Sequence, residues 1–163
     1  MPSSLSTRSL VLPLSKIKQG MAIPDLNHVI RHVPWSKLHK DENDNVLGIL
    51  PQAFALRDGE DGLSVNWIEH YEGNFDEQIV KIVQDIRSAV KVGPKSAFGV
   101  STVIAIKETC KNTTKSIKVV YWPNEKNPSH TLIRHLPAND IALLDALSKE
   151  AFSKLIRNSD ISI

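Results

Sequence analysis

The alternation of apolar and polar residues along the chain predicts several short β-strands. Val29 and Val33 take one face of a strand over 28–33, which Pro34 ends, and comparable runs recur further along. Residues 40–45 form a hydrophilic turn cluster. The predicted strands cover 28–33, 54–57, 63–67, about 98–106, 117–122 and 130–135.

Helical periodicity occurs in two segments. Over 75–90, apolar residues recur at helical spacing, Asn74 can cap the first turn, and Gly93-Pro94 stops the helix. A closing helix, capped by Asn139, follows the last strand. Its predicted buried positions are Ile141, Leu144, Leu147, Ala151 and Leu155.

Strands outnumber helices, and the two do not alternate as in βαβ units. We therefore predict an α+β fold with a mostly antiparallel sheet, two main helices and a single domain over 28–163. Residues 1–27 form a basic N-terminal arm in this prediction. The arm has the serines and cations of a transit peptide, but Pro13 interrupts any helix there, so an arm lying over the domain is favoured.

The composition, with 41% hydrophobic and 23% charged residues, is that of a soluble globular protein. The single cysteine, Cys110, excludes an intramolecular disulfide and a cysteine-based zinc site, which suits a reducing cytoplasm. No apolar run approaches the roughly 18–20 residues that cross a bilayer. We expect a cytoplasmic protein without membrane association.

The net charge of +2 hides strongly charged blocks. Residues 41–85 hold eleven acidic and two basic residues, whereas 86–134 hold two acidic and nine basic residues. Such blocks either steer a charged protein partner or pack beside each other and cancel. Because aromatic residues make up only 6% of the chain, nucleic-acid binding is not favoured.

Arg31 lies in the middle of the first predicted strand, on the face of Val29 and Val33. A guanidinium between two valines is either exposed at a sheet edge or desolvated, and a desolvated cation needs an anion. An acidic residue of 41–85 is one candidate for that anion. A ligand phosphate, held through two parallel hydrogen bonds, is the other.

Four further polar residues complete the candidate site. Ser64 and Asn66 share the polar face of one strand, and Asn127 and His130 flank an Asn-Pro turn. We predict that they and Arg31 line a pocket for a phosphate-bearing ligand. The cofactor is left open, with NAD or another nucleotide as the candidates. In the alternative interpretation, His130 only satisfies loop carbonyl groups.

The spacing of the residues disfavours other chemistries. His28 and His32 would lie about 13 Å apart on a strand, too far to share one metal ion. Ser64 with His130 or His32 could form a nucleophile pair, but no Gly-x-Ser-x-Gly turn surrounds Ser64. A lysine beside Cys110 could lower the pKa of its thiol, although an incidental thiol is favoured. The scattered glycines form no phosphate loop.

The order of these residues resembles a widespread group of small uncharacterised bacterial proteins. The shared pattern is Arg-(Arg/His)-Val/Ile-Pro, Ala-Phe, Leu-Ser-Val-(Asp/Asn) and Asn-Pro-x-His, here at 31–34, 53–54, 63–66 and 127–130. The likeness covers about 28–150 and points to these positions, not to a reaction.

The layout is also similar to that of ADP-ribosyltransferase-type toxins. Arg31 is on an early strand and Ser64 on a strand before a helix, but no glutamate matches the late position. Together these observations lead us to expect a small cytoplasmic bacterial accessory or effector protein, in a toxin–antitoxin or phage-defence context, with a protein partner from the same operon. The rival hypotheses are a non-catalytic interaction module of a larger complex and an ADP-ribosyltransferase-like enzyme.

Overall fold

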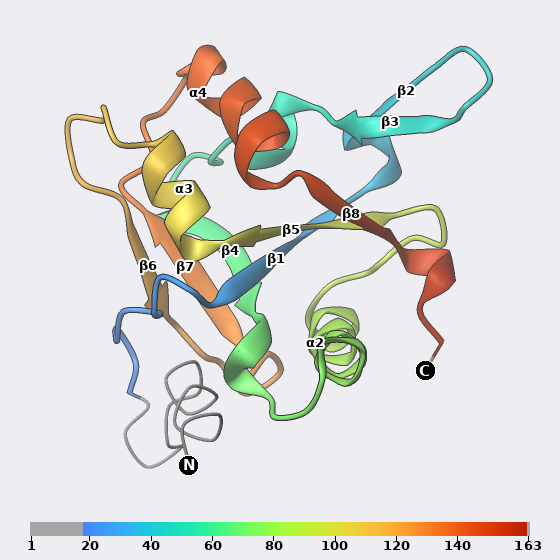
Figure 1. The fold of residues 1–163 in the computed structure, drawn as a ribbon, viewed down its shortest axis with the longest axis horizontal. Coiled ribbons are helices and arrows are strands. Elements are labelled where there is room, and N and C mark those ends of the chain that lie inside the picture. Colours follow the sequence, from blue (N-terminus) through green and yellow to red (C-terminus); the bar gives the residue numbers. More distant parts are fainter. Residues whose placement is uncertain (1–17, 163) are drawn as a thin grey trace.

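A computed structural model describes residues 18–162 of the protein. Its centre is a six-stranded antiparallel sheet in the order β6-β7-β4-β1-β5-β8, and a separate hairpin joins β2 to β3 (Figure 1). The strands are β1 (His28–Val33), β2 (Leu38–Lys40), β3 (Val46–Ile49), β4 (Gly62–Trp67), β5 (Ala97–Thr102), β6 (Lys118–Tyr121), β7 (His130–Arg134) and β8 (Lys154–Arg157).

Three α-helices of the described chain pack around this sheet. They are α2 (Phe75–Ala89), α3 (Val103–Thr109) and α4 (Ile141–Ala146), which continues as a π-helical turn over Leu147–Ala151. The predicted α+β class with a mostly antiparallel sheet is therefore confirmed. Within residues 18–162, no helix has the length and apolarity needed to cross a membrane.

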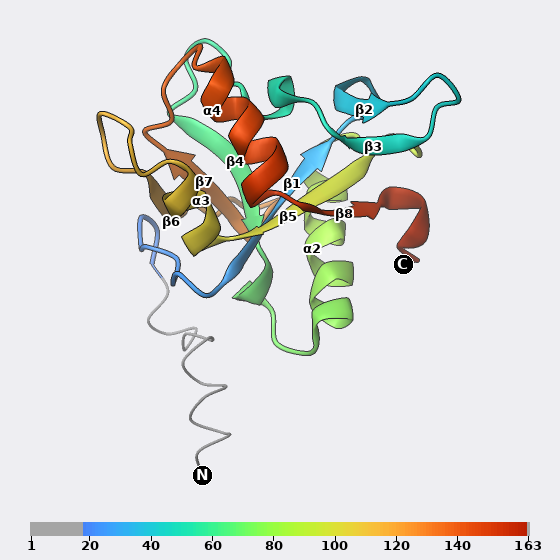
Figure 2. The same ribbon diagram turned by 45° about the horizontal axis from the view of Figure 1, so that its top comes forward.

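The sheet separates two hydrophobic clusters. One cluster joins Ile82 and Val83 of α2 to Ile30 of β1 and Phe98 of β5. The larger cluster lies under α3 and α4, and Figure 2 shows these helices on the opposite side of the sheet from α2. Because helices cover both faces, a polar side chain on a central strand is desolvated unless a hollow reaches it.

Helix α2 begins and ends close to the predicted positions. The Asn74 side chain accepts a hydrogen bond from the Glu77 amide at 2.9 Å, and the Glu77 carboxylate accepts one from the Asn74 amide at 3.0 Å. This reciprocal capping box satisfies two amide groups that the first turn leaves free. The predicted Asn74 cap is therefore confirmed.

The segment 98–106, predicted as one strand, is instead a strand followed by a helix. β5 ends at Thr102, whose Oγ1 accepts a hydrogen bond from the Ala105 amide at 3.1 Å and caps α3. Val103 and Ile106 are then buried at helical spacing. The β-branched residues favoured a strand by propensity, and the threonine cap overrides that preference.

The predicted strand over 54–57 is also wrong. Residues Pro51–Phe54 form a 3₁₀ turn with the proline at its first position, where the fixed φ of the ring is favourable. The Phe54 ring is fully buried, with its centroid 4.8 Å from that of Phe152. Packing against the larger cluster, rather than strand pairing, accounts for the apolar residues here.

The closing helix differs from its prediction at both ends. Asp140, not Asn139, caps it by accepting a hydrogen bond from the Leu143 amide at 3.1 Å, while Asn139 has a left-handed φ of 62°. Ile141 is 74% exposed rather than buried. Leu155 belongs to the edge strand β8, which pairs with β5 and was not predicted.

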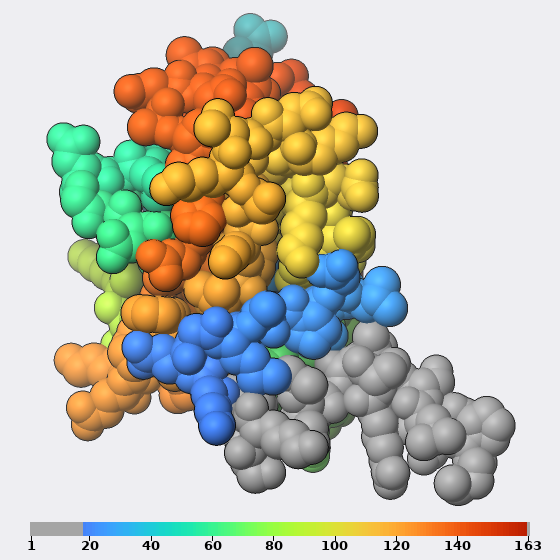
Figure 3. All heavy atoms as spheres, turned by 90° about the vertical axis from the view of Figure 1, so that its left-hand side faces the viewer, coloured from blue at the N-terminus to red at the C-terminus, as the bar shows by residue number. Residues whose placement is uncertain are grey.

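The described end of the predicted arm extends the sheet edge. Ala22 forms an antiparallel bridge with Val120 of β6, and the Ile23 amide donates to the Val119 carbonyl at 2.9 Å. Figure 3 shows the atoms of this blue segment packed against orange atoms from later in the chain. The remainder of the predicted arm, 1–17, lies outside the described residues.

Candidate anion-binding site

Arg31 occupies a break in the centre of the sheet. The ladder between β1 and β4 holds two register pairs and ends where Ile30 lies opposite Asn66, whereas β1 pairs with β5 along its whole length. One residue further on, the Nη1 of Arg31 donates to the Ser64 carbonyl of β4 at 2.7 Å. Its Nε donates to the Ala53 carbonyl at 3.0 Å. The guanidinium thus supplies donors where the ladder supplies none.

Burial makes the charged form of this guanidinium less stable. Desolvation lowers the pKa of Arg31 to about 10, against a smaller opposing effect of the Glu60 charge. The ion pairs among residues 18–162 do not include Arg31. Two backbone carbonyl groups therefore hold the side chain, and its Nη2 has no hydrogen-bond partner within the described chain.

A hollow of about 560 Å³ opens at this break, beside the carboxyl-terminal end of α2. Its wall contains one carboxylate, that of Glu60, among the described residues. Since α2 directs its negative end there, side chains rather than the helix dipole make the hollow positive. The permanent cations of the wall are Arg31 of β1, Lys37 after β1, Arg57 before β4 and Lys91 after α2.

The positive charge of Arg57 makes the charged forms of Arg31 and Lys37 less stable. Burial lowers the pKa of Lys37, and the charges of Arg31 and Arg57 lower it further. An anion entering the hollow would offset this repulsion and raise the pKa of Lys37. Mutually destabilised cations around a hollow are typical of a binding site for an anion.

Ser64 and His130 meet on the wall of the same hollow. Ser64 lies opposite Leu132 and Asn66 lies opposite His130, so His130 is the diagonal neighbour of Ser64 on one sheet face. The Ser64 Oγ and the His130 Nε2 are 3.0 Å apart. The His130 Nδ1 lies 2.7 Å from the Trp122 carbonyl.

The Trp122 carbonyl fixes the tautomer of His130. A carbonyl oxygen only accepts, so the Nδ1 atom carries the proton. In the neutral ring, Nε2 then accepts from the Ser64 hydroxyl. His130 does bond to a loop carbonyl, as the alternative interpretation expects, but its second nitrogen is engaged with Ser64.

Asn66 and Asn127 belong to a buried hydrogen-bond network behind the hollow. The Asn66 Nδ2 donates to the Asn127 Oδ1 at 2.5 Å and to the Ser129 Oγ at 2.8 Å. Ser129 in turn donates to an Asp85 carboxylate oxygen at 2.7 Å, and the Tyr71 hydroxyl donates to the same carboxylate. Both predicted amides still line the hollow, but their hydrogen bonds also anchor the 127–130 turn to α2.

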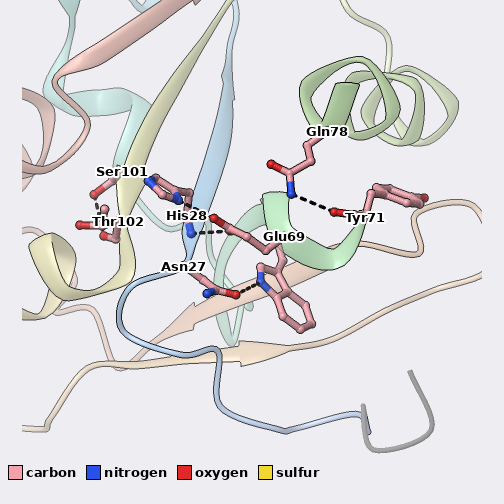
Figure 4. Close-up of polar contacts among 8 residues, drawn as sticks. Asn27, His28, Glu69, Tyr71, Gln78, Ser101 and Thr102 are labelled. Carbon is pink, nitrogen blue, oxygen red and sulfur yellow. Dashed lines mark hydrogen bonds and ion pairs between the residues drawn. The ribbon is translucent and has the colours of Figure 1, made fainter. Parts of the chain in front are cut away.

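The two histidines of the HxxxH pattern have opposite surroundings on β1. His28 contacts the Glu69 carboxylate at 2.5 Å (Figure 4), and this hydrogen bond raises the pKa of His28. His32 lies 5.8 Å from the Phe98 ring, and burial lowers the pKa of His32 to about 4. Within residues 18–162, no three His, Cys, Asp or Glu side chains gather as a metal site requires.

Cys110 has no activated thiol. Its side chain is 2% exposed, and burial raises the pKa of the thiol to about 11. The suggestion that a neighbouring lysine lowers this pKa is wrong, because desolvation dominates. The incidental interpretation of the thiol is the one that agrees with the structure.

Three cations of the hollow, Lys37, Arg57 and Lys91, were not among the predicted site residues. Each lies outside the long elements, in a short turn or just beyond a strand or helix end, and only the fold brings them to one wall. No periodicity marks such positions. The sequence places Lys37 shortly after Pro34, Arg57 shortly after Ala53-Phe54 and Lys91 just after α2, and this nearness to the predicted motifs is the one local signal that could have pointed to them.

We compared the chain with protein-family models, with curated protein sequences and with solved structures, and none of the three gave a match.

Proposed function

We propose that the hollow between β1 and β4 binds the phosphate group of a small ligand. Arg31 carries this proposal, because its guanidinium is largely buried and has no ion pair within residues 18–162. Burying an unpaired cation is costly, and a phosphate would offset that cost through charge-assisted hydrogen bonds. Lys37, Arg57 and Lys91 add positive charge to the same wall.

The remaining wall suits a nucleotide or an NAD-like molecule. A hollow of about 560 Å³ lies within the usual range for small-molecule sites. Ala89 of α2 and Val90 after it offer an apolar surface for a base, and Asn124 offers an amide for hydroxyl groups. We propose on this basis a cytoplasmic accessory or effector protein that recognises such a ligand.

Thermal unfolding with NAD, ATP and pyrophosphate tests the proposal. At a hundredfold excess over its dissociation constant, a ligand should stabilise the fold by about 2.7 kcal/mol. For a chain of this length, that is a shift of roughly 5–10 °C in Tm. If none of the three compounds shifts the Tm of the wild type, the proposal fails.

The variants for this test should leave Arg31 in place, because its hydrogen bonds hold two backbone carbonyl groups. Arg57→Ala and Lys91→Ala remove exposed cations of the wall instead. Each should weaken phosphate binding about fivefold. Lys111→Ala and Lys118→Ala remove exposed cations away from the hollow and serve as matched controls.

The competing proposal is a non-catalytic interaction module that docks a partner from the same operon. Among the described residues, Leu26, Leu47 and Ile141 are more than half exposed, but they lie before β1, on β3 and on α4. Scattered apolar residues of this kind are ordinary. Docking would then rely on the charged blocks, and association should weaken strongly as salt rises.

An ADP-ribosyltransferase-like reaction has less support. Such an enzyme would need a carboxylate beside the bound ligand, and Glu60 is the one carboxylate lining the hollow within the described chain. One oxygen of the Glu60 carboxylate is engaged in the local turn, because Oε1 accepts a hydrogen bond from the Arg57 amide at 2.5 Å. We therefore favour ligand recognition over transfer to a protein acceptor.

A further inference from the structure

Ser64 and His130 have the arrangement of a nucleophile and its base. The Ser64 hydroxyl donates to the His130 Nε2 across 3.0 Å, and the opposite nitrogen of the ring is held by the Trp122 carbonyl at 2.7 Å. A nucleophile, a base that accepts its proton and a third group that orients the base are the three parts of this chemistry. Here a backbone carbonyl takes the orienting role.

The sheet holds this pair rigidly. Five register pairs join β4 to β7, and the diagonal placement of Ser64 and His130 follows from that register. A second hydrogen bond fixes the orienting group, because the Trp122 amide donates to the His130 carbonyl at 2.9 Å. The contact therefore does not depend on a mobile loop side chain, as precise positioning requires.

The surroundings favour an anionic reaction partner. Both residues line the hollow, so a bound molecule can reach the hydroxyl. The Arg31 guanidinium bonds the Ser64 carbonyl, which places a permanent positive charge beside the residue that would attack. Such a charge favours a substrate that carries an anionic group.

We propose that Ser64 and His130 hydrolyse a carboxylic ester that carries a phosphate group; this substrate class rests on the proposed function. The Ser64 Oγ attacks the ester carbonyl carbon, and its proton passes to the His130 Nε2. The bond to the alcohol oxygen breaks as His130 returns the proton to it. A water molecule then attacks the acyl carbon and loses its proton to the same nitrogen. The bond from this carbon to the Ser64 Oγ breaks, His130 returns the proton to that oxygen, and the carboxylic acid is released.

A fluorophosphonate probe tests the pair on the full-length protein. The probe phosphonylates a serine whose proton is removed by a base, and it expels fluoride. We expect one adduct by intact mass, mapped to Ser64 and lost in Ser64→Ala. Labelling should slow by at least about a hundredfold in His130→Gln, which keeps polar contacts but cannot act as the base. Ser116→Ala, at an exposed serine before β6, is the matched control.

Pyrophosphate separates this inference from the proposed function. We expect it to slow labelling of Ser64, because it occupies the same hollow. If the protein binds pyrophosphate and Ser64 stays unlabelled, the nucleophile pair is wrong and the binding proposal stands. If Ser64 is instead labelled at the same rate in wild type and His130→Gln, His130 does not act as the base and the nucleophile pair is wrong. If Ser64 is labelled but no pyrophosphate binds, the substrate class fails with the proposed function.

Discussion

Arg31 and Ser64 are joined by a hydrogen bond of 2.7 Å at the point where β1 and β4 stop pairing. The Ser64 carbonyl accepts from the guanidinium, while the Ser64 hydroxyl donates to His130. One residue thus connects the partly buried cation to the histidine on the neighbouring strand. The break in the ladder is both a structural irregularity and the origin of the hollow.

Replacing Arg31 should destabilise the fold. In Arg31→Met, the carbonyl groups of Ser64 and Ala53 lose their donors, and we expect the free energy of unfolding to fall by about 3 kcal/mol. Urea denaturation measures this change. Lys118→Met, at an exposed site on β6, should change it by less than about 0.5 kcal/mol. An Arg31→Met variant as stable as the wild type would show that the guanidinium does not hold the strands.

His28 should stabilise the protein most at low pH. Its hydrogen bond to Glu69 raises the pKa of His28 in the folded state above the unfolded value of about 6.5. The contribution is therefore complete below about pH 6.5 and is lost as the pH rises through the folded pKa. We expect the stability difference between wild type and His28→Gln to shrink above pH 6.5 in urea denaturation. A difference that grows with pH would contradict this.

His32 should have the opposite effect. Burial lowers the pKa of His32 to about 4, so between pH 6.5 and 4 the unfolded chain binds more protons than the folded protein. The free energy of unfolding should therefore fall by about 2 kcal/mol as the pH is lowered across this window. This figure is smaller than the full pKa shift implies, because the ring is partly exposed. His32→Gln should lose less stability than the wild type on acidification. His39→Gln, at an exposed histidine of β2, is the control.

Cys110 should resist alkylation in the native protein. The thiol is buried and its pKa is raised to about 11, so little thiolate exists and the reagent cannot reach it. Iodoacetamide followed by mass measurement should show no adduct at pH 8 without denaturant and full modification in urea. Rapid native modification would mean that α3 opens readily at its end.

The elements predicted correctly from sequence are those that local patterns specify. The strand 28–33 is rich in valine and isoleucine and ends at a proline, and α2 combines an apolar stripe with a reciprocal cap by Asn74 and Glu77. The errors occur where tertiary packing overrides propensity. Phe54 lies in a turn because its ring is buried against Phe152, and β8 forms because β5 offers it a free edge.

The site could be predicted only in part for the same reason. Alternation placed Arg31 against valines and gave Ser64 and Asn66 a common polar face. The contact between Ser64 and His130 depends on the register of β4 with β7, which no local pattern specifies. The cations Lys37 and Lys91 come from segments far apart in sequence and meet only in the fold.

Calorimetric titration of pyrophosphate into the full chain of 163 residues measures whether the hollow binds a phosphate group. We predict saturable binding to one site, weakened about 25-fold in the double variant Arg57→Ala with Lys91→Ala, as two fivefold effects combine. Binding should also weaken as salt is raised, and the double variant Lys111→Ala with Lys118→Ala should bind like the wild type. Absence of binding to the wild type, or equal binding by both double variants, would contradict the account.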